Sequence, residues 1–516
     1  MDPTGNQGLN LRLRLGHLPP QLRCRFDGNK HREALECLQC AIVIRRSLSQ
    51  KDPDKFGPSL SSSLSLWAQN IELCKPDEVI TVLEKALGVL RRMVALNHPG
   101  FEQHLGEMLH EYAYHLYNLK RVVEALQPAQ EPVEIRRRLA VEDPVHFDPL
   151  LARSLQNYSL YLANSGQDSQ AIKYAKEAIS ILRRLATKAE NPLADLSQAL
   201  LNLSLSLNSN GRRNDAIVAI KESVTIRRRL VEANPAGYAH GLSCSLHLCA
   251  NYLSDTPRNL QEAVLLGQEA ATIRRRLWEQ DPNKYGAEPS DSLHNLAFCL
   301  SSSGNNEVAI GLAHESVEIQ RKLMEMEKSG PVDERSVVDG IQNHALYLAK
   351  VGRHAESIEV AQKAIDIRRR MVTETPSSTL YRGELAQLLL NVSLSLAASQ
   401  RTLDALPLMA ESLEIRRALA EAGPPDPGTS DPHLALADSM ANYGVLLTQV
   451  RRYTEATSLL EGAVEIVRRL LSNGEVHSVD QERLLAASLH CYACCLTYTP
   501  GREVESFVLA QECVSL

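Results

Sequence analysis

The sequence has no hydrophobic run that approaches the roughly 18 residues needed to cross a bilayer. Its first residues, Met1 to Gln21, also lack the apolar block of about 7–15 residues that marks a secretory signal peptide. Both absences argue against a membrane-spanning or secreted protein. The expected location is the cytosol or the nucleus, and we predict a cytoplasmic protein that makes no membrane contact.

Signs of several functional classes are missing as well. Lysine and arginine total 56 against 62 acidic residues, and a net charge of −6 argues against general binding of nucleic acid. The 11 cysteines are an odd number scattered through helical pattern, so we expect reduced thiols rather than a disulfide framework. No glycine-rich phosphate loop and no nucleophile elbow occurs. We therefore predict no enzyme, no cofactor, and no catalytic or metal-binding residue.

The main feature of the sequence is one motif that is repeated along the whole chain. Glu134 to Leu139 reads EIRRRL, and near-copies return at intervals of 45 to 51 residues. A period of this size indicates a stacked array, one elongated body rather than several globular domains. The copies begin at Ile44, Val89, Ile135, Ile181, Ile226, Ile273, Ile319, Ile367, Ile415 and Ile466, with a last half-copy ending at Leu516.

Each unit reads as a pair of helices. In the unit from Leu196 to Leu230, leucines recur at the three-to-four spacing of one helical face. Gly211 suits the left-handed cap that ends a helix, and a second apolar face follows it. Pro235 then marks a point where this second helix has ended. The predicted fold is all-α, with helical hairpins as its units.

Small residues recur where the two helices of each hairpin should cross. Helices can approach closely only where the side chains at the crossing are small. In the first helices these positions are Ala113, Ser159, Ser204, Ala250, Ala297, Ala345, Ser393 and Gly444. In the second helices they are Ala34, Ala125, Ala171, Ala216, Ala263, Ala309, Ser357, Ala405 and Ala456.

This arrangement of small residues, apolar residues and a break near Gly211 resembles the tetratricopeptide repeat family. The units exceed the usual repeat of about 34 residues, and in this they look like the repeats of kinesin light chains and of large fungal and bacterial arrays. The resemblance implies an α-solenoid of about eleven tandem helix-turn-helix repeats forming a right-handed superhelix. HEAT and armadillo arrays, with periods of ~40–47 residues, would not explain the paired small positions.

The resemblance covers almost the whole chain. We expect an irregular or disordered segment over residues 1–30 and a single α-solenoid over residues 31–516. Leu516 falls at the motif itself, without the polar cap that should close an array. This ending favours an alternative function, the sensor or regulatory region of a larger protein whose effector domain is absent from this chain.

The arginine clusters allow two interpretations. They could form a basic ridge that binds phosphates or acidic partners. They could instead be solvated helix ends, where cations meet the negative end of the helix dipole and an acid four residues earlier. We favour the second interpretation. The acid and base pairs that support it are Glu134 with Arg138, Glu318 with Lys322, Asp366 with Arg370, and Glu465 with Arg469.

Two local patterns suggest metal sites and fail on spacing. His110 and His115 are five residues apart, whereas the zinc protease signature needs two histidines four apart on one helical face. Two Cys-x-x-Cys pairs also occur, but they lie far apart in the chain and within helical pattern. We interpret them as packing residues. The pairs are Cys37 with Cys40 and Cys491 with Cys494.

A less conspicuous pattern of asparagines and apolar residues predicts the candidate binding site. An asparagine stands two residues before the small residue of most first helices, and an apolar residue follows three positions later. The asparagines are Asn157, Asn202, Asn295, Asn343, Asn391 and Asn442, and Leu248 and Glu111 interrupt the series. The apolar residues are Leu160, Leu205, Phe298, Leu346, Leu394 and Val445.

In the tetratricopeptide family this position faces the concave groove, so the resemblance implies that the asparagines hold a peptide backbone. An amide has both donors and an acceptor, which suits a peptide unit whatever its side chain. Alternatively, the asparagines hold a neighbouring helix and the apolar residues pack against the next repeat. Asp291, Asp339 and Asp438 stand where a carboxylate clamp would need cations. We predict a scaffold that binds an extended peptide or a protein partner, and no nucleic acid.

Overall fold

The computed structural model describes residues 76–96, 101–188, 192–326, 334–422, 431–473, 479–499 and 501–515, with scattered positions between 38 and 63. These residues form helices joined by short turns, and none of them forms a strand. The predicted all-α fold is confirmed. The irregular segment predicted at 1–30, and the residues Ala34, Cys37 and Cys40, lie outside the described part.

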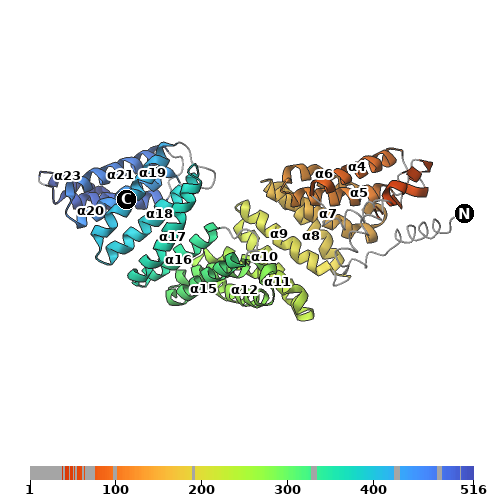
Figure 1. Ribbon diagram of the computed structural model, residues 1–516, viewed down its shortest axis with the longest axis horizontal. Helices are drawn as coiled ribbons and strands as arrows, with labels where there is room; N and C mark the ends of the chain where they lie inside the picture. Colours follow the sequence, from red (N-terminus) through yellow and green to blue (C-terminus); the bar gives the residue numbers. More distant parts are fainter. Residues whose placement is uncertain are drawn as a thin grey trace. The chain divides into compact units, whose positions relative to one another are not determined.

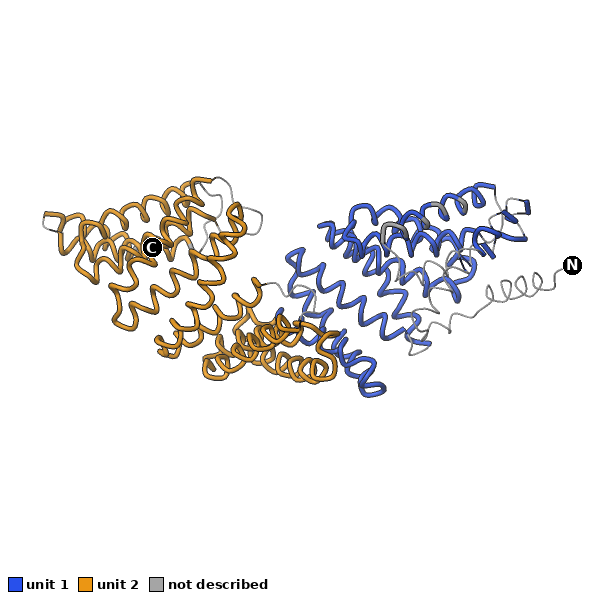
Figure 2. The backbone as a smooth tube through the Cα atoms, in the orientation of Figure 1, with its two compact units in different colours: residues 1–252 blue, residues 253–516 orange. Residues whose placement is uncertain are grey.

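The chain divides into two compact units, residues 1–252 and 253–516 (Figure 2). That residues 31–516 form one continuous solenoid stays a prediction. The helices of the first unit are α4 (Pro76–Ala95), α5 (Phe101–Asn118), α6 (Val122–Glu142), α7 (Pro144–Asn164), α8 (Asp168–Ala186), α9 (Pro192–Ser209), α10 (Arg213–Ala233) and α11 (Pro235–Ser254), whose last two residues belong to the second unit.

The second unit opens with the short 3₁₀ helix η2 (Pro257–Asn259). The α-helices that follow are α12 (Leu260–Gln280), α13 (Pro282–Tyr285), α14 (Glu288–Ser302), α15 (Asn306–Glu325), α16 (Glu334–Lys350), α17 (His354–Glu374), α18 (Thr379–Ala398), α19 (Thr402–Glu421), α20 (Pro432–Gln449), α21 (Tyr453–Asn473), α22 (Val479–Leu496) and α23 (Glu503–Ser515).

Within each unit the helices pair as predicted. Sequence neighbours lie side by side, for example α9 with α10 and α18 with α19 (Figure 1). Other second helices pack in the same way against the first helix of the following hairpin, as α8 does against α9 and α17 against α18. First helices of successive hairpins touch as well, among them α7 with α9 and α16 with α18. The first helices therefore share one side of each stack.

The turn inside most of the hairpins depends on one residue in the left-handed region, whereas η2 lies between α11 and α12. At Gly211 φ is +74°, as predicted, and the Arg212 N–H donates to the Leu207 carbonyl across the end of α9. Glycine takes this conformation without strain because it has no Cβ. Glycine also fills the corresponding places at Gly166, Gly304, Gly352 and Gly501, but Lys120, Gln400 and Arg451 adopt the same conformation with φ of 63°.

The prolines that end one hairpin also begin the next. Pro144, Pro235 and Pro432 are each the first residue of a first helix, where a missing N–H costs nothing. Asp143 and Asp431 precede two of them and accept backbone N–H bonds from the first helical turn. The helix break that the sequence pattern predicted is therefore a capped helix start.

The predicted small residues lie at the helix crossings and are buried wherever they are described. At the crossing of α16 and α17, the Ser357 hydroxyl donates to the Ala345 carbonyl at 2.7 Å. At the crossing of α20 and α21, a Cβ added to Gly444 would lie 2.6 Å from the Leu460 side chain. Small size at these positions is therefore required by the approach of the backbones.

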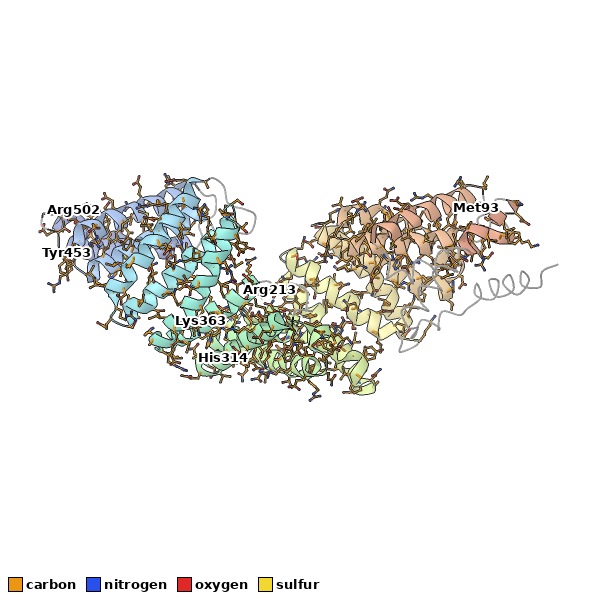
Figure 3. All side chains as sticks on the ribbon, in the orientation of Figure 1. Met93, Arg213, His314, Lys363, Tyr453 and Arg502 are labelled. Carbon is orange, nitrogen blue, oxygen red and sulfur yellow. The ribbon has the colours of Figure 1, made fainter. Side chains whose placement is uncertain are left out.

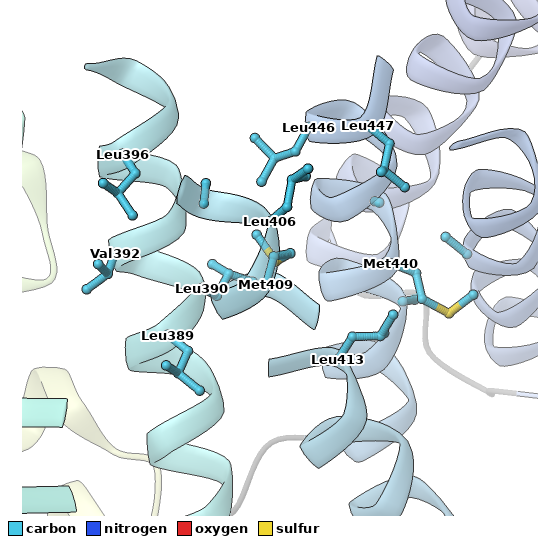
Figure 4. Close-up of a cluster of buried hydrophobic side chains, with 14 of the residues drawn as sticks. Leu389, Leu390, Val392, Leu396, Leu406, Met409, Leu413, Met440, Leu446 and Leu447 are labelled. Carbon is cyan, nitrogen blue, oxygen red and sulfur yellow. The ribbon is translucent and has the colours of Figure 1, made fainter. Parts of the chain in front are cut away.

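Larger apolar side chains fill the space between successive hairpins. In the second unit, α18 contributes Leu389 and Leu396 to this core, and α19 contributes Leu406 and Met409 (Figure 4). Leu446 and Leu447 reach the same core from α20. A core of this kind links each hairpin to the next one in sequence, as expected of a solenoid.

The first arginine of several clusters is buried at the junction between hairpins. Arg136 of α6 is 2% exposed and donates to the Leu150 carbonyl of α7 at 3.1 Å and to the Ser154 hydroxyl. Arg274 of α12 repeats this with Glu288 at 3.0 Å and Ser292 at 2.8 Å on α14. A buried cation is tolerated only when its hydrogen bonds are supplied by the protein. Each arginine thus ties a second helix to the following first helix.

Carboxylates or amides support the other buried arginines. Arg368 pairs with Asp339 at 3.1 Å and with Glu384 at 2.7 Å, on the first helices before and after its own. Arg227 has no carboxylate partner among the described residues, and it donates to Gln198 and to the Gly241 carbonyl. Burial lowers the pKa of Arg136 to about 10, which still leaves it charged at neutral pH.

The second and third arginines of the clusters make other contacts. The second pairs with a glutamate of the next second helix, as Arg137 does with Glu177 at 2.9 Å and Arg183 with Glu222 at 2.7 Å. The third returns to the first helix of its own hairpin. This contact is seen for Arg138 with Glu102, Arg184 with Asp148, and Arg370 with Glu334.

The prediction that these arginines are solvated helix ends is therefore wrong for the first position of the cluster. It is also wrong about the partners of Arg138 and Arg370, which pair with another helix rather than with an acid four residues earlier. Glu134 and Asp366, the acids named in that prediction, accept hydrogen bonds from glutamines on their own helices. The partners of Arg138 and Arg370 lie far away in the sequence, so local spacing could not identify them.

Enlarging a crossing residue should destabilise the fold. Ala216 of α10 has no exposed surface, so we expect Ala216→Leu to lower the free energy of unfolding by about 1–3 kcal/mol. Val218 on the same helix is 69% exposed, and Val218→Leu should leave stability unchanged. Urea unfolding followed by circular dichroism measures both. Equal midpoints for wild type and Ala216→Leu would show that Ala216 is not at a tight crossing.

The buried arginine can be tested with its serine partner. Arg136→Leu should cost about 1–3 kcal/mol because the Ser154 hydroxyl and the Leu150 carbonyl lose a buried donor. The exposed ion pair of Arg137 should be worth about 0–1 kcal/mol, so Arg137→Leu should cost less. The chain itself holds buried Leu182 and Ala199 at the equivalent positions. The double variant Arg136→Leu/Ser154→Ala should thus recover stability relative to Arg136→Leu, and additive losses in urea unfolding would contradict the pairing.

Candidate functional site

The six predicted asparagines lie on the first helices, at the same place in each hairpin. All six side chains are half-buried, while the residues that follow them in the helix pack into the core. The first unit holds two of them and the second unit holds four. In chain order they are Asn157 on α7, Asn202 on α9, Asn295 on α14, Asn343 on α16, Asn391 on α18 and Asn442 on α20.

Two of these asparagines bond to the preceding first helix. Asn157 pairs with His110 of α5, and Asn343 pairs with His294 of α14, each at 3.3 Å between Nδ2 and Nε2. An amide nitrogen can only donate, so the histidine Nε2 accepts and the ring is neutral. The alternative prediction, that the asparagines hold a neighbouring helix, therefore describes these two residues.

Three of the other four amides bond within their own helix. Asn202 and Asn391 each accept from a glutamine one turn earlier at 3.0 Å, and Asn442 donates to Asp438. An amide offers two donors and an oxygen with two lone pairs. Among the described residues, one polar atom of each of these three side chains has no hydrogen-bond partner: Nδ2 of Asn202, Nδ2 of Asn391 and Oδ1 of Asn442.

The apolar residues three positions after the asparagines are only partly covered. Phe298 is 47% exposed and Leu346 is 40% exposed, with Leu205 and Leu394 close to these values. Leu160 and Val445 are half-buried. The four exposed residues keep a large part of their surface uncovered by the next repeat, and their role as groove contacts stays a prediction. Tyr114, three positions after Glu111, is 46% exposed as well, and the same spacing could have identified it.

One cavity opens among these residues in the second unit. It has a volume of about 300 Å³ and lies between α16 and α18, with residues of α17 as its floor. Leu346, Asn391 and Leu394, all predicted from the sequence, line it, and Lys350 and His354 line it too. The structure thus brings the apolar residue of one pair and both residues of the next pair together around a space that can admit a side chain.

Two acidic residues near the asparagines have a raised pKa. Burial raises the pKa of Asp291, and the cation of Arg274 opposes this shift. Solvent still reaches the Asp291 side chain. Asp195 near Asn202 shows the same combination, with its pKa raised by burial.

The histidines beside the asparagines are held neutral. Burial lowers the pKa of His110 to about 3, and the cations of Arg136 and Arg153 add to the effect. His344, which follows Asn343, packs edge-on against His314 at 5.6 Å between ring centroids, and burial lowers its pKa to about 4. These rings carry no charge at neutral pH.

The residues of the two metal-like patterns have other surroundings in the described part of the chain. His110 bonds to Asn157, and neither it nor His115 belongs to a group of three ligand side chains within reach of one ion. Cys491 and Cys494 also belong to no such group. The packing interpretation holds for the neighbouring Cys495, which is buried, but is wrong for Cys494, which is exposed.

Comparison with known proteins agrees with the repeat pattern. The family model described as Tetratricopeptide repeat matches residues 196–236 and 436–477. The first match spans most of α9 and all of α10, and the second spans most of α20 and all of α21, so each covers one hairpin. None of the curated proteins is similar enough in sequence to count as a match. No described helix has an apolar stretch long enough to cross a membrane.

Solved structures are similar to this chain at low sequence identity, and RapI, with a TM-score above 0.5, shares the fold. The apo form of RapI is 12% identical and aligns over 80% of this chain and 98% of its own, with a TM-score of 0.51. BtubC (BKLC) from P. vanneervenii is 18% identical over 50% of this chain and 88% of its own, with a TM-score of 0.37. The putative kinesin light chain repeats from Podosopora anserina are 18% identical over 44% and 97%, with a TM-score of 0.35.

The neutral histidine predicts how stability depends on pH. His110 has a lower pKa in the folded chain than the usual value of about 6.5 in the unfolded chain. Between these values the unfolded state binds a proton that the folded state does not, so stability falls as pH falls below about 6.5. The loss should approach about 1.4 kcal/mol per pH unit from this residue.

A variant without the titrating ring isolates this contribution. The urea midpoint of the wild type should fall more steeply between about pH 6.5 and pH 5 than that of His110→Gln. His146 is exposed, so His146→Gln should keep the wild-type slope. If His110→Gln showed the same slope as the wild type, the buried neutral state of His110 would be disproved.

Proposed function

We propose that this chain, whose repeats belong to the tetratricopeptide family, is a non-enzymatic scaffold that binds an extended peptide or protein segment along its first helices. Tetratricopeptide repeats generally mediate protein interactions, and their fold is typically a scaffold without catalytic activity. The proposed contacts are the amides of the asparagines and the apolar residues three positions after them.

The observation that carries this proposal is the exposure of the apolar residues. The exposed fraction lies between 39% and 47% for Leu205, Phe298, Leu346 and Leu394. Each of them follows an asparagine of the same helix. Asn202 and Asn391 keep an Nδ2 atom without a hydrogen-bond partner among the described residues, and Asn295 and Asn343 make a polar contact within the protein. A half-buried amide next to an exposed apolar side chain is suited to an extended chain. The amide pairs with the peptide backbone, and the apolar group covers a peptide side chain.

The arginine clusters are the rival binding surface, but several of their cations are already paired with glutamates. Arg137, Arg183, Arg275 and Arg369 are engaged by glutamates of the next second helix at 2.6–2.9 Å. An acidic partner would have to displace these glutamates. This favours the face of the first helices as the binding surface.

Replacing three asparagines of the second unit should weaken binding without unfolding the chain. Each lost neutral hydrogen bond is worth about 0.5–1.5 kcal/mol, so Asn295→Ala/Asn343→Ala/Asn391→Ala should cost about ten- to a thousandfold in Kd. The ligands are peptides selected on the full chain from a phage-displayed library of random decapeptides, with Kd measured by fluorescence anisotropy. Helicity should stay close to that of the wild type, and the free energy of unfolding should fall only by about the value of the one hydrogen bond that Asn343 makes to His294, about 0.5–1.5 kcal/mol.

A second triple variant serves as the control. Asn210, Asn283 and Asn305 are exposed and lie in turns or at a helix start, so their replacement by alanine should leave Kd unchanged. Kd should also depend weakly on salt, because amides and apolar groups are not screened. Unfolding of the first triple variant, or a steep loss of affinity with salt, would count against a groove of asparagines.

A further inference from the structure

The cavity between α16 and α18 has a more specific use. It is bounded by Ala345 and Ala349 of α16, Ser357 and Ala361 of α17, and Ser395 and Ala398 of α18, in addition to the leucines of the predicted pattern. Ser357 donates to the Ala345 carbonyl and Ser395 donates to the Asn391 carbonyl, so both hydroxyls are satisfied within the protein. The wall that remains is apolar. We call this space the α16–α18 pocket.

The pocket exists because α18 carries a short side chain where its neighbours carry long ones. Ala398 stands seven residues after Asn391. The equivalent residues are Lys350 after Asn343 and Gln449 after Asn442. Alanine leaves open the space that a longer side chain would cover, and Lys350 of the adjacent helix borders that space.

Lys350 is a cation without an acidic partner. Its ammonium group donates to the Ser301 hydroxyl at 2.9 Å and lies 5.8 Å from the centre of the Tyr347 ring. It forms no ion pair with any described residue, whereas Arg353, close by in sequence, pairs with Glu356 at 2.7 Å. A cation that is left unpaired at the edge of an apolar pocket complements an acidic group of a ligand.

Two further polar atoms border the pocket. The Nδ1 atom of His354 is buried and has no hydrogen-bond partner. The Nδ2 atom of Asn391 has none among the described residues, since the bond of this amide to Gln387 uses its oxygen. Of the two, the Asn391 Nδ2 atom is a donor that a backbone passing over the opening can use.

We infer that the α16–α18 pocket selects peptides in which a large apolar residue and an acidic residue are two positions apart. The inference rests on the proposed function, because it assumes an extended peptide. In an extended chain, side chains at positions i and i+2 point to the same side and lie about 7 Å apart. The apolar side chain enters the pocket, and the carboxylate meets Lys350.

The experiment uses the full chain and the phage-displayed random decapeptides. Peptides selected on the wild type should share an apolar residue, any residue, and then aspartate or glutamate, in either direction. Peptides selected on Lys350→Glu should carry lysine or arginine in place of the acid. Lys363 is an exposed lysine of α17, labelled in Figure 3, and Lys363→Glu, which makes the same charge change, should keep the wild-type preference.

Synthetic end-blocked peptides then give the size of each effect. Changing the acid of a selected peptide to lysine should weaken binding to the wild type by about three- to tenfold and strengthen binding to Lys350→Glu by a similar factor. Ala398→Leu fills the pocket, so it should weaken binding of peptides with a large apolar residue by at least about tenfold. Circular dichroism confirms that each variant is folded.

The outcomes separate this inference from the proposed function. If selected peptides lose affinity for the triple asparagine variant but respond to neither Lys350→Glu nor Ala398→Leu, the pocket inference is wrong and the groove stands. If peptides respond to none of these variants, or if none is selected, both are overturned. A reversed charge preference with Lys350→Glu, together with the loss in Ala398→Leu, supports both.

Discussion

A guanidinium group that leaves water must keep its hydrogen bonds, and this requirement governs the junction between successive hairpins. Arg136 meets it through a carbonyl and a hydroxyl of α7, and Arg368 through carboxylates of α16 and α18. Each set of partners exists only at one separation and one rotation of the neighbouring helix. The junction therefore also determines which side of each first helix faces outward, and that side bears the asparagines and their apolar neighbours.

The general plan of the fold could be predicted from the sequence because it depends on local spacing. The period of the arginine motif gave the hairpins, Gly211 gave a turn, and the small residues at the crossings are buried as expected. All three signals follow from the geometry of one helix or one pair of helices. The positions of the candidate site residues along the first helices could be predicted for the same reason.

The partners of these residues could not be predicted, since they belong to another hairpin. Three adjacent arginines look alike in the sequence, yet Arg136, Arg137 and Arg138 reach three different helices. Asn343 and His294 meet although 49 residues separate them, which requires the register between two hairpins. The α16–α18 pocket depends on the short side chain of Ala398 in one hairpin and the long side chain of Lys350 in the preceding one. Contacts between neighbouring repeats thus carry the information that local patterns lack.

The turns inside the hairpins have an evolutionary consequence. Lys120, Gln400 and Arg451 hold a left-handed conformation that five other turns assign to glycine, at a cost of roughly 1 kcal/mol for each side chain. Natural selection removes only changes that push a protein below the stability it needs. A solenoid joins many hairpins through separate contacts, so a strained turn weakens one hairpin and leaves the others intact. Turns of this chain are therefore free to drift in sequence, while the crossings and the buried arginines are under continuous constraint.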